Sequence, residues 1–293
     1  MADQRKRSTS RRELSRNPRF EQISPEVGEL DEAAVDELMA DDPDELLGML
    51  ADLAGATDRG LRDLAQRLAG RLFLDLARRG TTVRRGIGRI ESLPYRPDGG
   101  DLDIDASIEA IAEAGSGAID PERLRVRGWS KPSTAWCLLV DRSGSMGGKP
   151  LATSAVAAAA VACRQPDDYS VLAFGKDVVA AKSQDIAKPA DRVVHDVLAL
   201  RGFGTTDLAG ALQAAKLQLA RSNAGRKVVV LLSDCRATVD GDPVAAARGI
   251  DELIVLAPEA DAEEATAFAA RVGAKLATVS GPSKVPDALA SVI

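Results

Sequence analysis

Residues 134–165 read TAWCLLVDRSGSMGGKPLATSAVAAAAVACRQ and pass from an apolar run through a polar loop into a stretch rich in alanine. This succession predicts a strand, a glycine-containing turn and a helix. The alternation continues, because the apolar runs YSVLAF, KVVVLLS, ELIVLA and KLATVS follow, with helical stretches between most of them. Such alternation predicts an α/β fold, a doubly wound, mostly parallel sheet with helices on both faces. We expect Asp177–Lys182 to add a short antiparallel edge strand.

The polar loop after the first strand carries oxygen-bearing side chains at alternate positions, Asp141, Ser143 and Ser145. Alternate side chains of an extended segment point to one side, so these three can converge on one point outside the sheet. One carboxylate with two hydroxyls is a hard-oxygen set that suits Mg²⁺ or Mn²⁺ better than Zn²⁺. Gly147 and Gly148 permit a sharp turn into the next helix. Taken alone, the loop is explained equally well as a serine-rich turn with an incidental aspartate.

Two later loops add further oxygen atoms. Thr206 lies in the segment GFGTTDLAGAL, which leads into a helix, and Asp234 directly follows the apolar run KVVVLLS. With these three loops in order, the chain resembles the von Willebrand factor A (VWA) family. The metal-ion-dependent adhesion site of that family combines D-x-S-x-S, a threonine in a G-T-x-x-x-x-A-L context and an aspartate after an apolar strand. The resemblance covers residues 131–293 and carries over five ligand positions: Asp141, Ser143, Ser145, Thr206 and Asp234.

The resemblance also implies what the site does. It implies a cation, Mg²⁺ or Mn²⁺, where the first and fourth strands of the sheet are neighbours, with one coordination position left for an Asp or Glu of a protein partner. The likeness is greatest to intracellular bacterial members, which work with AAA+ ATPases of the MoxR or magnesium-chelatase type in metal insertion or protein maturation. We therefore expect a metal-dependent protein-binding module, not an enzyme, that acts as adaptor or co-factor of such an ATPase and binds the ATPase or its client.

Two positions depart from the pattern of the family. Cys235 replaces the glycine after the third-motif aspartate, and Thr205 replaces the glycine before the second-motif threonine. Neither change removes an oxygen ligand, but a side chain at Cys235 narrows the backbone freedom at the rim of the site. For Cys235 we weigh a redox-sensing thiol against a small buried filler and favour the filler.

Two other functions remain open. A metal-dependent hydrolase would use the same cation to activate water, and the sequence-near candidates for proton transfer are Lys149, Asp207 and Asp240. Asp207 is better explained as a charge at a helix N-terminus, and the sole histidine, His195, as a residue of an amphipathic helix. A purely structural scaffold with an empty site is the third interpretation, and it predicts no effect of cations on binding.

The chain divides by composition into four regions. Residues 1–24 are basic with little to bury, so we expect a disordered tail. Residues 25–80 are acidic with leucines at helical spacing, which predicts an N-terminal extension of two or three helices packed on the main domain, with a helix end near Gly60. Residues 81–130 are mixed, with a short strand and a helix expected around DLDID, and residues 131–293 form the VWA domain.

Composition excludes several classes of partner and location. The net charge of −6 argues against a surface that attracts nucleic acid or anionic membrane, so we expect neither partner. The three cysteines form no C-x-x-C pair, which favours a reducing, cytoplasmic compartment. The N-terminal segment is charged throughout, without the apolar core of a signal peptide, and no apolar run reaches the ~20 residues of a membrane span.

Overall fold

The chain forms two compact units. One comprises Met1–Thr82, Thr134–Asn223 and Lys227–Ile293, and the other comprises Val83–Ser133 with Ala224–Arg226. The computed structural model describes residues 14–15, 17, 19–25, 29–56, 58–79, 89–95, 101–115, 117–130, 133–142, 147–202 and 204–293. None of the helices in this described part is both long enough and apolar enough to cross a membrane.

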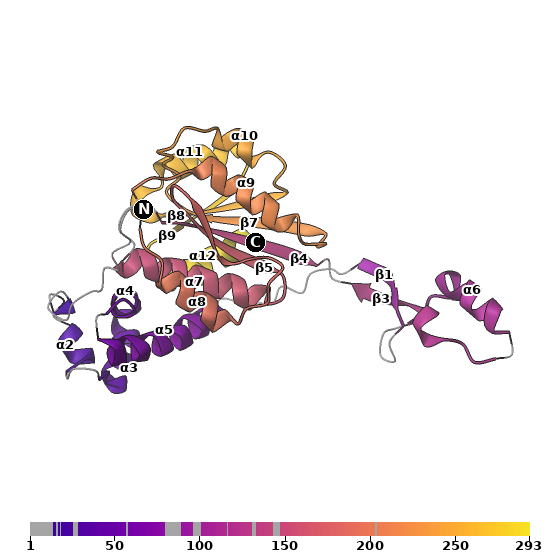
Figure 1. The fold of residues 1–293 in the computed structure, drawn as a ribbon, viewed down its shortest axis with the longest axis horizontal. Coiled ribbons are helices and arrows are strands. Elements are labelled where there is room, and N and C mark those ends of the chain that lie inside the picture. Colours follow the sequence, from indigo (N-terminus) through magenta and orange to yellow (C-terminus); the bar gives the residue numbers. More distant parts are fainter. Residues whose placement is uncertain are drawn as a thin grey trace. The chain divides into compact units, whose positions relative to one another are not determined.

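The larger unit is built on a six-stranded sheet (Figure 1). Its strands are β4 Thr134–Asp141, β5 Tyr169–Phe174, β6 Val178–Lys182, β7 Arg226–Leu232, β8 Glu252–Pro258 and β9 Lys275–Val279. They lie in the order β6-β5-β4-β7-β8-β9, so β4 and β7 are neighbours in the middle of the sheet. The pairs β4–β5, β7–β8 and β8–β9 are parallel, and β6 runs antiparallel to β5 at one edge. The α/β fold, the mostly parallel sheet and the antiparallel edge strand are therefore confirmed.

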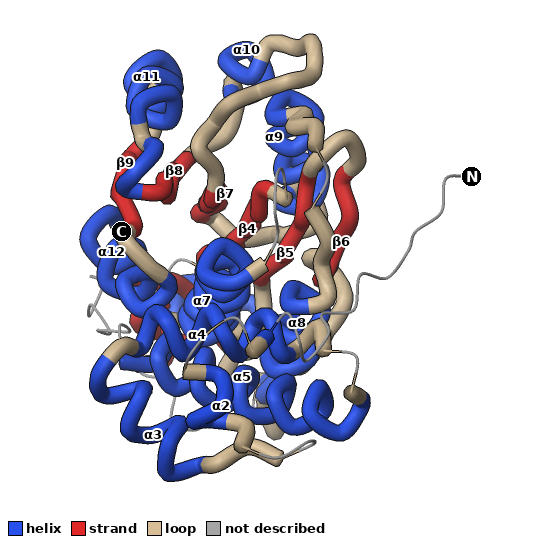
Figure 2. The backbone as a smooth tube through the Cα atoms, turned by 90° about the vertical axis from the view of Figure 1, so that its left-hand side faces the viewer, coloured by secondary structure: helices blue, strands red, loops and turns tan. Residues whose placement is uncertain are grey.

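Helices cover both faces of this sheet (Figures 1 and 2). One face carries α7 Gly148–Arg164, α8 Ala190–Leu198 and α12 Val285–Val292, and the other carries α9 Leu208–Leu219, α10 Pro243–Ala247 and α11 Glu263–Val272. Because both faces are covered, every residue of β5 is buried, and its apolar run has no polar alternation. The small side chains of α7, a run of alanine at residues 157–160, are buried from both sides.

The N-terminal helices pack on the α7 face of the same unit (Figure 2). They are α3 Glu32–Asp41, α4 Pro43–Leu53 and α5 Arg59–Arg79, of which α4 and α5 contact α7 directly. Each start is capped by an aspartate: Asp31 for α3, Asp42 for α4 and Asp58 for α5. The helix end expected near Gly60 is wrong, because Asp58 accepts a hydrogen bond from Leu61 N at 2.7 Å and Gly60 lies in the first turn of α5.

We expected residues 1–24 to form a disordered tail, and this expectation is wrong for the C-terminal part of the segment. The short helix α2, Phe20–Ile23, buries both of its large apolar side chains, and Leu14 joins the same core with 9% exposure. These residues lie against the N-terminal helices, which provide the apolar surface that the basic segment itself lacks. Residues 1–13 lie outside the described part of the chain.

The second unit contains a three-stranded antiparallel sheet in the order β1-β3-β2. Its strands are β1 Arg89–Pro94, β2 Asp101–Leu102 and β3 Arg125–Ser130, and one α-helix, α6 Ile104–Ala114, follows β2. Asp103 caps α6 by accepting a hydrogen bond from Ala106 N. The strand and helix expected around DLDID are therefore confirmed. Single-turn 3₁₀ helices complete the described elements, namely η1 Pro121–Arg123, η2 Glu259–Asp261 and η3 Pro282–Lys284.

Candidate metal centre

The candidate centre lies where the winding direction of the large sheet reverses. From β4 the chain proceeds to β5 on one side, and from β7 it proceeds to β8 on the other, so the loops after β4 and β7 separate at their carboxyl ends. Asp141 is the last residue of β4, and Asp234 follows shortly after β7. Both carboxylates line one open cavity of about 400 Å³. Two of the five predicted ligands are thus brought to the same cavity.

Ser233 connects the two strands at this cavity. Its hydroxyl donates to Asp141 Oδ2 at 2.5 Å and accepts from the backbone N–H of Cys235 at 2.9 Å. Ser233 is only 4% exposed, so water competes little for its hydrogen bond to Asp141. This bond therefore fixes the orientation of the Asp141 carboxylate. In the sequence Ser233 stands only as the end of the apolar run, so this role was missed. The available signal was a hydroxyl residue directly before a candidate ligand.

Asp234 is held in its own tight turn. Its Oδ1 accepts a hydrogen bond from Arg236 N at 3.0 Å, and the intervening residue, Cys235, has a φ of +63°. This left-handed conformation is one that glycine adopts without strain and that other residues adopt only rarely. Burial, followed by the nearby carboxylates of Asp234 and Asp141, raises the pKa of the Cys235 thiol to about 12. A thiol that stays protonated at neutral pH fits a buried filler and not a reactive redox sensor.

Thr206 is buried beside the chain that follows Asp234. Its N–H donates to Thr238 Oγ1 at 2.7 Å, and its carbonyl accepts from Thr238 N at 3.1 Å. Thr206 does not line the cavity that contains the two aspartates, but these bonds tie its loop to the loop of Asp234. The next residue, Asp207, caps α9 by accepting from Gly210 N at 2.8 Å, which confirms it as a charge at a helix N-terminus.

The remaining predicted ligands, Ser143 and Ser145, lie outside the described residues. Within the described part, no group of three or more His, Cys, Asp or Glu side chains could hold a metal ion. The donors at the cavity are therefore two carboxylates and hydroxyl groups. This chemistry fits a hard divalent cation such as Mg²⁺ or Mn²⁺ and lacks the nitrogen and sulfur ligands that Zn²⁺ favours.

The proton-transfer candidates have partners of their own. The ammonium group of Lys149 lies 3.5 Å from a carboxylate oxygen of Glu45, and the Asp207 carboxylate is engaged as a helix cap. His195 contacts Gln66 of α5 through Nε2 at 2.8 Å and is not a lining residue of the cavity. Asp240 is exposed in the loop before α10.

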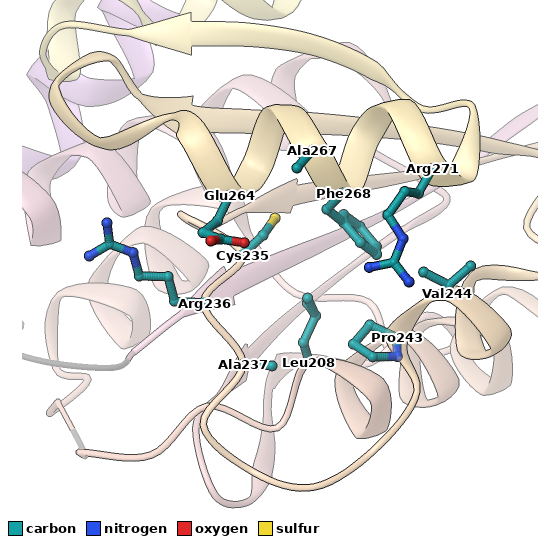
Figure 3. Close-up of a pocket in the computed structure, with 10 residues that line it drawn as sticks. All are labelled: Leu208, Cys235, Arg236, Ala237, Pro243, Val244, Glu264, Ala267, Phe268 and Arg271. Carbon is teal, nitrogen blue, oxygen red and sulfur yellow. The ribbon is translucent and has the colours of Figure 1, made fainter.

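A second cavity of about 430 Å³ is lined by residues 235–237 and by residues of α10 and α11 (Figure 3). Cys235, Leu208 and Phe268 form its apolar part. At its edge, Arg236 is paired with Asp261 at 2.6 Å. Neighbouring residues of one turn thus line two cavities, Asp234 the first and Cys235 the second.

Comparison with known proteins agrees with the fold. The family described as VWA domain containing CoxE-like protein matches residues 64–279, well over half of the chain. The chain belongs to this family. The match extends beyond the sheet, because it includes most of α5 and the whole of the second unit. No curated protein matches the CoxE-like chain significantly.

The solved structures that match resemble the CoxE-like chain only distantly. A von Willebrand factor type A protein from Catenulispora acidiphila has 14% identity over 56% of this chain and 42% of its own, with a TM-score of 0.45. The manganese-loaded TRAP protein of Plasmodium vivax has 14% identity over 50% and 69%, with a TM-score of 0.40. Proximal thread matrix protein 1 from the mussel byssus, with a zinc-occupied MIDAS motif, has 13% identity over 55% and 47%, with a TM-score of 0.42. The CoxE-like chain thus spans less than half the length of two of these three proteins.

Proposed function

We propose that this CoxE-like VWA protein is a metal-dependent protein-binding module that serves as adaptor or co-factor of a MoxR-type AAA+ ATPase in protein or metal-cofactor maturation. The observation that carries the proposal is the pair of carboxylates, Asp141 and Asp234, on adjacent loops at the point where the winding of the sheet reverses, both facing an open cavity. Open α/β sheets bind their ligands at this place. The proposed setting is the cytoplasm.

The ligand set explains why a partner would complete the site. Asp141, Ser143, Ser145, Thr206 and Asp234 would hold Mg²⁺ or Mn²⁺, and only two of these five side chains carry a negative charge. A hard divalent cation takes about six oxygen ligands, so positions remain for water or for a carboxylate oxygen of the partner. When bound, the cation supplies positive charge that attracts such a carboxylate. Ser233 keeps the Asp141 carboxylate oriented for this role.

The proposal assigns binding and not catalysis to the centre. Of the groups that a hydrolase would need, Lys149 faces Glu45, and the carboxylate of Asp207 already caps α9. Neither is left as an uncommitted proton-transfer group beside the aspartates. An activated water would therefore have no dedicated base among these two residues.

The experiment follows cation binding and partner capture with one set of proteins. Wild type should bind Mn²⁺ in competition with Mg²⁺, and Asp141→Ala should lose that binding, because a carboxylate ligand is removed. The immobilised wild type should retain the MoxR-type ATPase of the same organism, or its client, in Mg²⁺ but not in EDTA. Asp234→Ala in Mg²⁺ should behave like wild type in EDTA.

Three outcomes would count against the proposal. If wild type and Asp141→Ala bind Mn²⁺ with equal affinity, Asp141 is not a ligand and the proposed metal centre is wrong. Capture that is independent of Mg²⁺, EDTA and Asp234 would favour a structural scaffold. Metal-dependent hydrolysis of a phosphoester or peptide by the purified chain would favour the hydrolase.

A further inference from the structure

The second cavity runs along one face of α11 (Figure 3). Its lining from this helix consists of Glu264 and the residues three, four and seven positions later, namely Ala267, Phe268 and Arg271. Residues at this spacing share one side of a helix. With a rise of about 1.5 Å per residue, Glu264 and Arg271 are about 10 Å apart along the helix axis. The cavity is therefore a trough with an acid at one end and a base at the other.

The wall of the trough that faces α11 is largely apolar. Leu208 at the start of α9, Cys235 in the turn after β7, and Pro243 and Val244 at the start of α10 line it. Leu208 and Cys235 are buried, as is Phe268 of α11, so these three side chains form a floor and not a rim. The volume of about 430 Å³ lies within the range of ligand sites in proteins.

The charged groups at the two ends of the trough are not engaged in ion pairs. Neither Glu264 nor Arg271 forms an ion pair with any residue that the structure describes, whereas Arg236 at the edge is held by Asp261 at 2.6 Å. Figure 3 shows the ring of Phe268 between the Glu264 carboxylate and the Arg271 guanidinium. The trough thus offers a negative group, an apolar surface and a positive group in this order.

The helix dipole explains these charges only in part. An acid in the first turn and a base in the last turn both stabilise α11. Glu263 also supplies a first-turn acid, yet it does not line the trough. Dipole stabilisation requires no shared face, so it does not explain why Glu264 and Arg271 lie on the same side of α11 over an apolar floor.

The turn after β7 has no free backbone donor for a ligand. The N–H groups of Cys235, Arg236 and Ala237 donate within the turn, to Ser233 Oγ, Asp234 Oδ1 and the Cys235 carbonyl. Recognition in the trough must therefore come from side chains.

We propose that the trough binds an extended segment of a protein partner with a basic, an apolar and an acidic side chain at alternate positions. The basic side chain meets Glu264, the apolar one lies on Phe268 and the acidic one meets Arg271. Alternate side chains of an extended chain point to one side, and its first and fifth residues are about 13 Å apart, which long side chains adapt to the trough. A free amino acid carries both charges next to one carbon atom and cannot reach both ends. The inference goes beyond the proposed function and does not rest on the metal centre.

Two synthetic pentapeptides with blocked ends, KALAD and DALAK, represent the two chain directions and serve as probes. The ¹⁵N-labelled full chain is titrated with each peptide in EDTA, and its amide chemical shifts are followed by nuclear magnetic resonance. One peptide should bind, with saturating shifts at residues 235–237, 243–244 and 263–272. We expect a Kd of about 1 mM that rises with salt, because ion pairs between exposed groups contribute little and are screened.

Removal of either charge should weaken binding about three- to fivefold. Glu264→Ala is compared with Glu263→Ala, which removes the neighbouring acid outside the trough. Arg271→Ala is compared with Arg192→Ala, which removes an exposed arginine from α8 on the other face of the sheet. Both controls should bind like wild type. Ala267→Phe should abolish binding, because a ring at this exposed position fills the trough.

A double-mutant cycle identifies which charge meets which end. Arg271→Ala should leave unchanged the affinity for a peptide with asparagine in place of aspartate, because that ion pair is already lost. Glu264→Ala should leave unchanged the affinity for a peptide with glutamine in place of lysine. A merely structural role of Arg271 or Glu264 would instead weaken every peptide equally and would overturn the proposal.

Four further results would overturn it. These are no shifts with either peptide at about 5 mM, binding that survives Ala267→Phe, equal binding of the neutral peptide QALAN, and equal affinities of the charge-removing variants and their controls. If 6-aminohexanoic acid binds with the same dependence on Glu264 and Arg271 while the peptides do not, the trough is a site for a small dipolar molecule and not for a polypeptide. If one variant loses the wild-type amide spectrum, the remaining variants and the peptide analogues decide.

Discussion

The two compact units bury their apolar side chains to very different degrees. In the sheet unit, Leu138 and Leu139 of β4 are completely buried, as is nearly every apolar residue of the central strands. In the second unit, Ile90, Ile104 and Ile108 are 61%, 62% and 58% exposed. There the sheet and α6 are joined mainly by polar contacts, such as the hydrogen bond from Arg125 N to the hydroxyl of Ser107 at 2.9 Å.

This difference teaches where the stability of the chain resides. Burial of apolar surface is the main favourable term in folding, so the sheet unit supplies most of the free energy of unfolding. The second unit buries few apolar side chains among its described residues, chiefly Val126 and Ala110. The same class of substitution should therefore have unequal effects in the two units.

The largest effect is expected from a pair of matched truncations. Leu138→Ala should lower the free energy of unfolding by about 3 kcal/mol, because it leaves a cavity at the centre of the sheet. Ile108→Ala in α6 should change it by less than about 0.5 kcal/mol, since the side chain is already exposed and alanine favours helix. Urea unfolding of the full chain measures both. Equal losses in the two variants would contradict the division of stability.

A second truncation tests whether the N-terminal segment shares in that stability. Phe20→Ala should cost about 3 kcal/mol, because the ring is 1% exposed within the common core. Removal of residues 1–13, which carry no large apolar side chain apart from Met1, serves as control and should leave the thermal midpoint unchanged. If the Phe20→Ala protein is as stable as wild type, Phe20 does not contribute to the core, and the disordered tail extends to residue 24 as first expected.

The smallest change expected from a single variant concerns the pH dependence of stability at alkaline pH, at about 1 kcal/mol per pH unit. Burial raises the pKa of the Cys137 thiol to about 12, and Cys235 behaves alike, so each thiol ionises more readily in the unfolded chain than in the folded one. Below about pH 9 both thiols are protonated in both states, and their ionisation does not affect the free energy of unfolding. As the pH rises from about 9 towards 12, the thiols ionise in the unfolded chain only, so the free energy of unfolding falls by about 1 kcal/mol per pH unit for each thiol. Urea unfolding between pH 8 and 10.5 measures the slope. Cys137→Ala should reduce that slope, and an unchanged slope would refute the assignment.

The sequence allows most of the sheet to be predicted because four of its strands are buried on both faces. Such strands appear as continuous apolar runs, and β4, β5, β7 and β8 were each predicted in this way. The edge strand β9 was predicted from the run KLATVS, although most of its side chains are partly or fully exposed. The strands β1 and β3 have no such run and were missed, because most of their side chains whose burial is described are exposed. The burial of Phe20 was missed for a related reason, since the apolar surface that covers it comes from helices elsewhere in the chain.

The candidate site could be predicted only in part. The positions of Asp141 and Asp234 follow from strand ends, which local sequence defines. The contact of Asp52 with Gly148 and that of Ser233 with Asp141 join distant segments, and no local pattern encodes such tertiary contacts. For Cys235, the sequence shows that a cysteine stands where the resemblance leads us to expect glycine. It does not show that this cysteine adopts a left-handed conformation with a φ of +63°.

The strand order has a kinetic consequence. The chain forms one half of the large sheet from residues 134–182 and the other from residues 226–279, each with short crossovers between neighbouring strands. The two halves meet between β4 and β7, where Ser233 bonds to Asp141 across 92 residues. Closing so long a loop is slow compared with local pairing, so this seam should form late in folding. Because Asp141 and Asp234 belong to different halves, a partly folded chain would lack the complete proposed cation site, and the first uptake of Mn²⁺ during refolding would mark the moment at which the seam closes.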